Sequence, residues 1–129
     1  LKFGDSTPTA KEMFGDGYTR NHVSSQLSTS LHYPEIGLVL YFTTDDRLVN
    51  IVADGDTGTF SLLGQPLAEI FGAIPPYSDR IREWIQERGL TLRTPRSHMG
   101  CWDYEIDGMN FSFAIPEEGA PAVSLRSGT

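Results

Sequence analysis

Hydrophobic and polar residues alternate in several segments of the chain, a pattern typical of β-strands that bury one face. The clearest alternation covers residues 38–42 and is followed, after an Asp45-Asp46 turn, by a return strand over 48–52. The two segments together predict an antiparallel hairpin. The same pattern predicts further strands near 22–32, 90–95, 101–104, 109–113 and 122–125.

Helical spacing and end signals predict helices at 8–14, 66–71 and 78–88. Thr7 is a candidate cap for the first helix, and Pro8 and Pro66 stand at first helical positions, where a missing N–H costs little. Each range is followed directly by a glycine, the residue that most often ends a helix. The last range carries an apolar stripe of three residues: Ile81, Trp84 and Ile85.

The order of helix, spacer, tyrosine, glycine and alternating strand occurs twice along the chain. Tyr33 precedes Gly37 by four residues, and Tyr104 precedes Gly108 by the same interval. A repeated unit of this kind predicts architecture rather than chemistry. If it reflects duplication, the positions equivalent between the copies are Gly37 with Gly108, and Phe42 with Phe113.

We therefore predict an α+β protein made of two tandem helix-plus-antiparallel-hairpin units. The first unit covers 1–58, and the second covers 59–129 with an inserted helix near 78–88. Together they are expected to form one compact domain with a continuous, curved antiparallel sheet and helices packed on one face.

The charge of the chain limits its partners. Seventeen acidic and ten basic residues give a net charge of −7 over 129 residues, which disfavours nucleic acid and anionic membrane surfaces. A basic protein partner remains compatible with this charge, and no apolar run is long enough to insert into a membrane. Cys101 is the single cysteine, so no intrachain disulfide can form. We expect a cytoplasmic location, or a periplasmic one if an N-terminal signal was removed; the oligomeric state is left open.

The chain offers no combination of residues typical of catalysis or of metal binding. His98 and Cys101 would supply two ligands, whereas a zinc site needs at least three from the protein. Cys101 lacks an oriented base, and the acidic pair Asp54 and Asp56 stands in a predicted turn. We therefore expect no enzyme activity, no catalytic residue, no metal and no cofactor.

Candidate partner-binding residues are the tyrosine, tryptophan and acidic residues near the strand starts, together with Tyr41, which faces outward if Leu38, Leu40 and Phe42 face the core. Aromatic side chains bury a large area with few rotatable bonds, and carboxylates steer a basic partner. The candidates are Tyr33, Glu35, Tyr41, Trp102, Asp103, Tyr104, Glu105 and Asp107. An alternative interpretation places Trp102 and the tyrosines in the core.

Residues 4–15, with a glycine on each side of a short helix, resemble the opening of the small BamE/SmpA-type domain. Trp102-Asp103-Tyr104 and the strand 109–113 are similar to the second part of that domain. Two such units in tandem resemble the β-lactamase inhibitory protein fold. The resemblance implies a module that binds proteins through a sheet face and adjoining loops and performs no chemistry. The chain is also similar, in size and charge, to bacterial toxin-immunity proteins.

The leading hypothesis is a protein-binding inhibitor, an antitoxin-like immunity protein that occludes the basic active site of a bacterial toxin. The alternative hypothesis is a small-molecule-binding domain or small enzyme with an apolar pocket between sheet and helix. The aromatic residues expected to line that pocket are Trp84, Trp102, Phe111 and Phe113.

Overall fold

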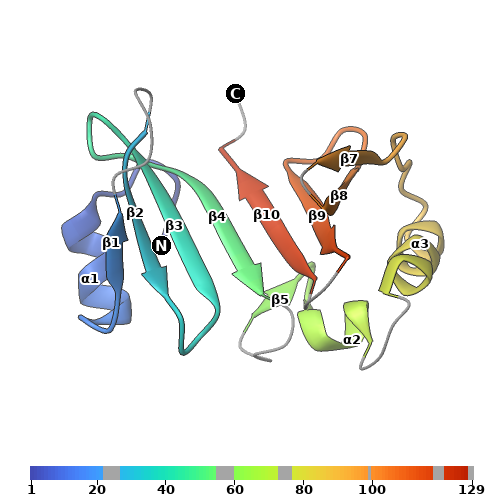
Figure 1. Ribbon diagram of the computed structural model, residues 1–129, viewed down its shortest axis with the longest axis horizontal. Helices are drawn as coiled ribbons and strands as arrows, with labels where there is room; N and C mark the ends of the chain where they lie inside the picture. Colours follow the sequence, from blue (N-terminus) through green and yellow to red (C-terminus); the bar gives the residue numbers. More distant parts are fainter. Residues whose placement is uncertain (22–26, 55–59, 73–76, 99, 118–120, 128–129) are drawn as a thin grey trace.

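The computed structural model describes residues 1–21, 27–54, 60–72, 77–98, 100–117 and 121–127, and these form an α+β protein around one large antiparallel sheet (Figure 1). The sheet has eight strands in the order β1 (Thr19–Asn21), β2 (Leu27–Tyr33), β3 (Leu38–Thr43), β4 (Leu48–Asp54), β10 (Ala122–Arg126), β9 (Phe111–Pro116), β8 (Cys101–Glu105) and β7 (Arg96–His98). The described helices are α1 (Thr7–Phe14), α2 (Leu67–Phe71) and α3 (Tyr77–Glu87), and a small ribbon pairs β5 (Ser61–Leu62) with β6 (Gln65–Pro66). The predicted α+β class and the large antiparallel sheet are confirmed.

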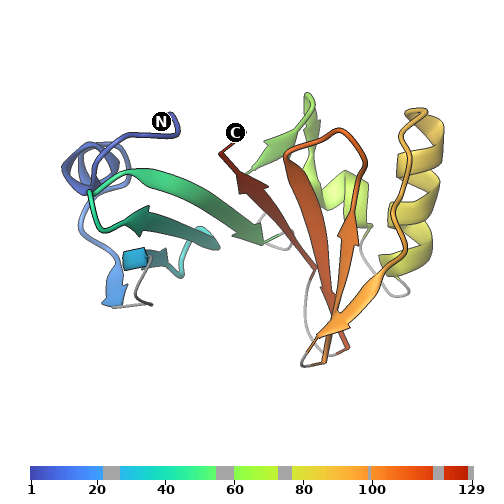
Figure 2. The ribbon, with the colours of Figure 1, turned by 90° about the horizontal axis from the view of Figure 1, so that it is seen from above.

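One face of the sheet carries the core. The register aligns Leu38, Ala53, Val123, Phe113 and Tyr104 in a row that crosses five strands on the same face. Because side chains alternate along each strand, this row is one of several parallel apolar rows. The described helices all pack on this face, with α1 and α3 at opposite ends of the sheet (Figure 2).

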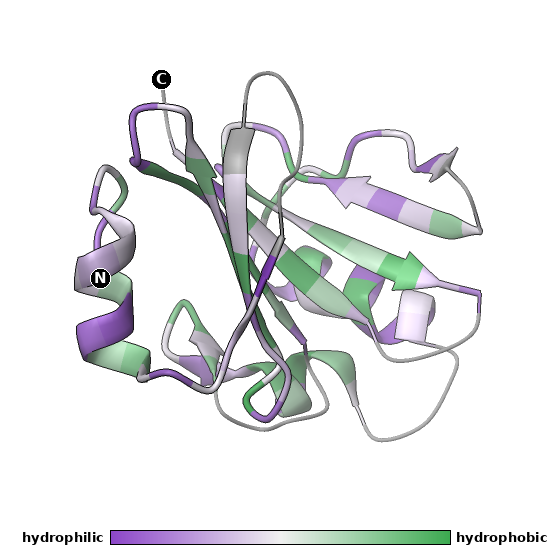
Figure 3. Ribbon diagram, turned by 60° about the vertical axis from the view of Figure 1, so that its left-hand side comes forward, coloured by the Kyte–Doolittle hydropathy of each residue, from purple (hydrophilic) through white to green (hydrophobic). Residues whose placement is uncertain are grey.

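The core has two clusters, one under each group of helices. The first lies between α1 and the strands β2–β4 and contains Ala10, Leu31, Tyr33, Leu38, Leu40, Phe42 and Leu48. The second lies beneath α2 and α3 and includes Ile70, Phe71, Ile81, Trp84, Ile85, Phe111, Phe113 and Val123. Phe60 packs against both clusters. Hydrophobic residues recur along the central strands of the sheet, where they form green bands in Figure 3.

The start of α1 is capped from a distant turn. Ser6 occupies the N-cap position without a side-chain hydrogen bond, and Thr7 belongs to the helix rather than capping it. Asp46, in the turn between β3 and β4, accepts hydrogen bonds from the Thr7 N–H at 3.1 Å and the Thr7 hydroxyl at 3.2 Å. Its backbone has a φ of 58°, a conformation that aspartate and asparagine tolerate better than most residues. The local prediction missed this cap because its donor and acceptor lie in different elements.

Asp46→Ala should lower the free energy of unfolding by about 1–2 kcal/mol, because the helix N-terminus loses its acceptor. Asp46→Asn is the matched control, since it keeps an oxygen acceptor and tolerates the same backbone conformation. We expect its loss to be less than half as large. Urea denaturation of both variants measures the difference, and equal losses would contradict the cap.

Two predicted strands change place in the structure. Residues 90–95 form no regular strand; Leu92 makes an isolated bridge to Ile106, and β7 begins only after Pro95, which has no N–H to donate. The predicted strand at 109–113 begins at Phe111, because a hydrogen bond from the Met109 N–H to the Ile106 carbonyl closes a turn there. Met109 is consequently 39% exposed rather than part of the core. Residues 22–26 of the predicted strand 22–32 and nearly all of the turn around Asp54–Asp56 lie outside the described residues.

Candidate binding surfaces

The alternation of β8 divides its candidate residues between two faces. Trp102 pairs with Ile115 and Tyr104 with Phe113, which places both aromatic residues on the helix-covered face. Asp103 pairs with Ala114 and Glu105 with Ser112 on the other face. The four consecutive candidates 102–105 therefore do not form a single surface.

Tyr33 and Tyr104 are core residues. Tyr33 is 2% exposed, lies 5.6 Å from the Phe14 ring and 5.7 Å from the Tyr18 ring, and donates its hydroxyl to the Gly15 carbonyl at 3.2 Å. Burial, with smaller contributions from Tyr18 and Asp16, raises the pKa of the Tyr33 hydroxyl, so it remains a neutral donor. Tyr104 is 5% exposed. The structure therefore places these two tyrosines in the core, as the alternative interpretation had them.

The acidic candidates differ in how far their charge is compensated. Arg93 contacts Glu105 at 3.5 Å and Asp107 at 2.9 Å, and the hydrogen bond to Asp107 is the main cause of the raised pKa of the guanidinium. This pairing is at the surface and therefore contributes little to stability. Glu35 is exposed in the turn between β2 and β3, and Asp103 is half-buried on β8. Among the predicted acids, Glu105 and Asp107 already share a cation.

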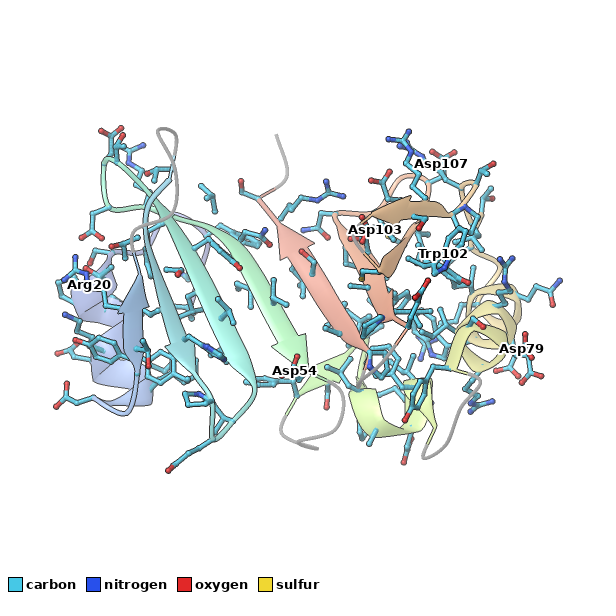
Figure 4. All side chains as sticks on the ribbon, viewed as in Figure 1. Arg20, Asp54, Asp79, Trp102, Asp103 and Asp107 are labelled. Carbon is cyan, nitrogen blue, oxygen red and sulfur yellow. The ribbon has the colours of Figure 1, made fainter. Side chains whose placement is uncertain are left out.

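The second face of the sheet has no described helix packed against it, and we call it the open face. A row across it joins Val39, Val52, Ser124, Ser112 and Glu105 through the strand register. Neighbouring rows contribute Tyr41, Asn50, Asp54, Ala114, Ala122 and Asp103. Asp54 and Asp103 stand on strands of opposite halves of the sheet (Figure 4).

The middle of the open face is made of small side chains. Ser112 and Ala114 on β9 lie beside Ser124 and Ala122 on β10. Ser124 donates its hydroxyl to the Asn50 side-chain oxygen at 3.1 Å, which ties β10 to β4 across this face. Larger side chains flank this strip, with Tyr41 on β3 on one side and Asp103 and Glu105 on β8 on the other. Between Tyr41 and this strip stands β4, which contributes Asn50 and Val52 to the same face.

A groove opens on the helix-covered side, where α3 approaches the end of the sheet. It has a volume of about 820 Å³ and is lined by Tyr77, Ser78, Arg82, Thr94, Pro95, Trp102, Tyr104, Ile115, Pro116 and Glu117. Trp102 lies between β8 and α3 in Figure 4 and is 41% exposed. Most of this groove was not predicted from the sequence. The alternation along the strand did indicate that Trp102 and Tyr104 lie on the same face.

The aromatic residues expected to line a pocket fill the core instead, except for Trp102. Trp84 meets Phe113 edge-to-face at 5.7 Å and Phe111 at 6.4 Å, and all three are at most 3% exposed. The Trp84 indole N–H donates to Gln65 at 2.8 Å. Three of the four side chains predicted to line the alternative pocket are therefore buried in the core, whereas Trp102 lines the groove beside α3.

The described residues offer little for metal or thiol chemistry. Within the described ranges, no group of three or more His, Cys, Asp and Glu side chains is placed to hold a metal ion. Burial raises the pKa of the Cys101 thiol, and the neighbouring Asp103 carboxylate raises it further, which disfavours the reactive thiolate. The His98 side chain lies outside what the structure describes. None of the described helices is long and apolar enough to span a bilayer.

Comparison with protein-family models, curated proteins and solved structures found no match for this chain. The described residues form an α+β protein whose sheet has one face without a described helix and a groove beside α3.

Proposed function

We propose that this chain is a protein-binding inhibitor, an immunity protein that neutralises a bacterial toxin by occluding its basic active site. The open face supports this proposal most strongly, because it is a broad surface that no described helix covers. A standard protein–protein interface covers about 800 Å² on each partner and therefore needs a broad, uncovered surface. The resemblance to inhibitor domains that bind proteins through a sheet face points to the same surface.

The shape and charge of the open face favour a protruding, basic partner. Its strip of small residues leaves room for a convex loop, while Tyr41 offers a half-buried aromatic anchor across β4 from that strip. Asp103 lies on the opposite side, and the whole chain carries a net charge of −7. Such a charge accelerates association with a cationic cleft and disfavours acidic competitors.

We further propose that the sheet consists of two tandem units related by a pseudo-twofold axis through the Val52–Ser124 pair. The strand order supports this, because β1 to β4 follow in sequence order from one edge of the sheet to its centre. From the other edge, β7 to β10 do the same. The register then equates Leu40 with Phe113, since Leu40 pairs with Ile51 and Phe113 pairs with Val123. This alignment differs by two residues from the one predicted from sequence. It equates Phe42 with Ile115 instead.

The two glycines that follow Tyr33 and Tyr104 by four residues differ within this alignment. Gly37 is the last residue of a turn closed by its own N–H to the Pro34 carbonyl, whereas Gly108 is the third residue of the turn from Ile106 to Met109. Both have positive φ, 63° and 76°. The two glycines therefore occupy different positions in their turns. The equal tyrosine-to-glycine spacing is consequently not evidence for this alignment of the two units.

A paired charge variant tests the open face. Tyr41→Ala with Asp103→Lys should weaken binding to a toxin domain encoded directly upstream by roughly 30-fold or more, the effect of losing one interface anchor. Tyr104→Ala is unsuitable for this purpose, because Tyr104 is 5% exposed and its loss would damage the core. Isothermal titration of the purified pair measures the affinity.

The control truncates one large side chain and reverses one acidic charge at exposed positions of α1. Met13→Ala with Glu12→Lys alters the net charge by the same amount at exposed positions. We expect this control to change affinity less than about threefold, through long-range electrostatics alone. Equal losses in both double variants would contradict the open face as the interface. Failure of the unmodified chain to bind the toxin domain or to restore growth of cells producing it would contradict the inhibitor proposal.

A further inference from the structure

The groove beneath α3 has apolar walls and an aromatic side chain at its opening. Tyr104, Ile115, Pro95 and Pro116 are among its lining residues, and Trp102 remains 41% exposed although it belongs to the core face of β8. An indole in that position can cover a flat ligand and exclude water from it. The volume of about 820 Å³ is within the range of small-molecule sites.

One arginine in this groove differs from the other arginines on or next to α3. Arg80 pairs with Glu83 at 3.5 Å and donates to the Glu69 carbonyl at 3.3 Å, and Arg88 donates to Gln65 at 3.1 Å. Arg82 instead has its guanidinium 5.1 Å above the centre of the Tyr104 ring. Within the described residues, no carboxylate lies within 4.0 Å of Arg82.

We propose that this groove binds a small aromatic monocarboxylate, with its ring against Trp102 and its carboxylate on Arg82. A guanidinium stacked on an aromatic ring is held in one plane, and its N–H groups match the two oxygens of a carboxylate. Glu117 lines the same groove, and its negative charge disfavours a ligand with a second carboxylate. The site lies on the helix-covered side and is independent of the open face.

The two tryptophans provide a built-in readout for binding. In a ¹⁵N-labelled sample, Trp102 and Trp84 each give an indole N–H signal, and Trp102→Phe assigns them. Titration with 2-naphthoate should move the Trp102 signal to saturation, whereas the Trp84 signal should stay in place because this indole is buried and bonded to Gln65. The neutral analogue 2-naphthalenemethanol and the cation 2-naphthylmethylamine are the matched probes.

Naphthoate should bind about tenfold more tightly than the alcohol, the usual effect of one charge-assisted hydrogen-bonded pair. Arg82→Gln should reduce naphthoate affinity to that of the alcohol, while Arg80→Gln, two residues earlier on α3, outside the groove lining and already paired, should leave it unchanged. Glu117→Gln should strengthen naphthoate binding a few-fold by removing a like charge.

Several results would overturn the proposal: equal affinity for the three probes, unchanged naphthoate affinity in Arg82→Gln, or equal movement of both indole signals. The Tyr41→Ala and Asp103→Lys double variant should keep full naphthoate affinity, because its changes lie on the opposite face. The groove and the toxin-binding surface can therefore fail separately. The spectrum of each variant also reports whether it is folded.

Discussion

Trp84→Ala should lower the free energy of unfolding by about 3–5 kcal/mol, the range for removing a large aromatic side chain from a core. Trp84 is 2% exposed and lies between α3 and the sheet, with the Phe113 ring 5.7 Å away. Its indole N–H donates to Gln65 at 2.8 Å, and the Arg88 guanidinium lies 5.0 Å from its ring. The substitution thus leaves a cavity and removes the partner of a side-chain acceptor.

Trp102→Ala is the matched control, because it deletes the same side chain from a site that is 41% exposed. Its loss should stay below about 1 kcal/mol, as for most surface substitutions. Urea denaturation followed by circular dichroism compares the two variants without relying on tryptophan fluorescence. Similar losses would mean that Trp102 is as important to the core as Trp84, and the groove would then be a structural site.

The sequence predicted the elements well where the evidence for them was local. The alternation over 38–42 and the stripe of Ile81, Trp84 and Ile85 each depend on neighbours within a few residues, and both correspond to β3 and α3. A turn at Gly108 was expected, but the strand after it was placed two residues too early, because Met109, Phe111 and Phe113 alternate as strand residues do. A periodic pattern shows which residues can form a strand, but not where a hydrogen bond closes the turn.

Strand order could not be predicted from local patterns. The pairing of β4 with β10 joins Asn50 to Arg126 in the register, and the side-chain hydrogen bond between Asn50 and Ser124 spans 74 positions of the chain. Several strands have similar apolar faces, so their sequences do not state which edges meet. The pairing matters for function, because it brings the small residues of β10 beside β4 and creates the continuous open face.

The candidate site was predicted in composition more than in arrangement. Tyr41 lies on the open face, as the alternation over 38–42 predicts, and Asp103 lies there too, whereas Tyr33 and Tyr104 lie in the core. The period of two along β8 separates Asp103 from its neighbours, and this could have been derived from sequence. The groove could not, because it depends on how α3 is positioned by the packing of Trp84 on Phe113.

The second large effect concerns the coupling of the two core clusters. Leu40→Ala, in the first cluster, should lower the free energy of unfolding by about 2–5 kcal/mol, because Leu40 is fully buried beneath α1. The two clusters are joined by five residue pairs between β4 and β10 and by Phe60, which contacts both. We therefore expect one cooperative transition in which damage to the first cluster also destabilises the second.

Trp84 reports that coupling directly, because its fluorescence monitors the second cluster only. In Leu40→Ala on a Trp102→Phe background, the Trp84 transition should shift to lower urea by the same amount as the circular dichroism of the whole chain. An unshifted Trp84 transition would instead show two halves that unfold separately. The open face takes side chains from both halves, so a single transition means that the proposed interface exists only when the whole sheet is assembled, and that a toxin bound there would stabilise both clusters at once.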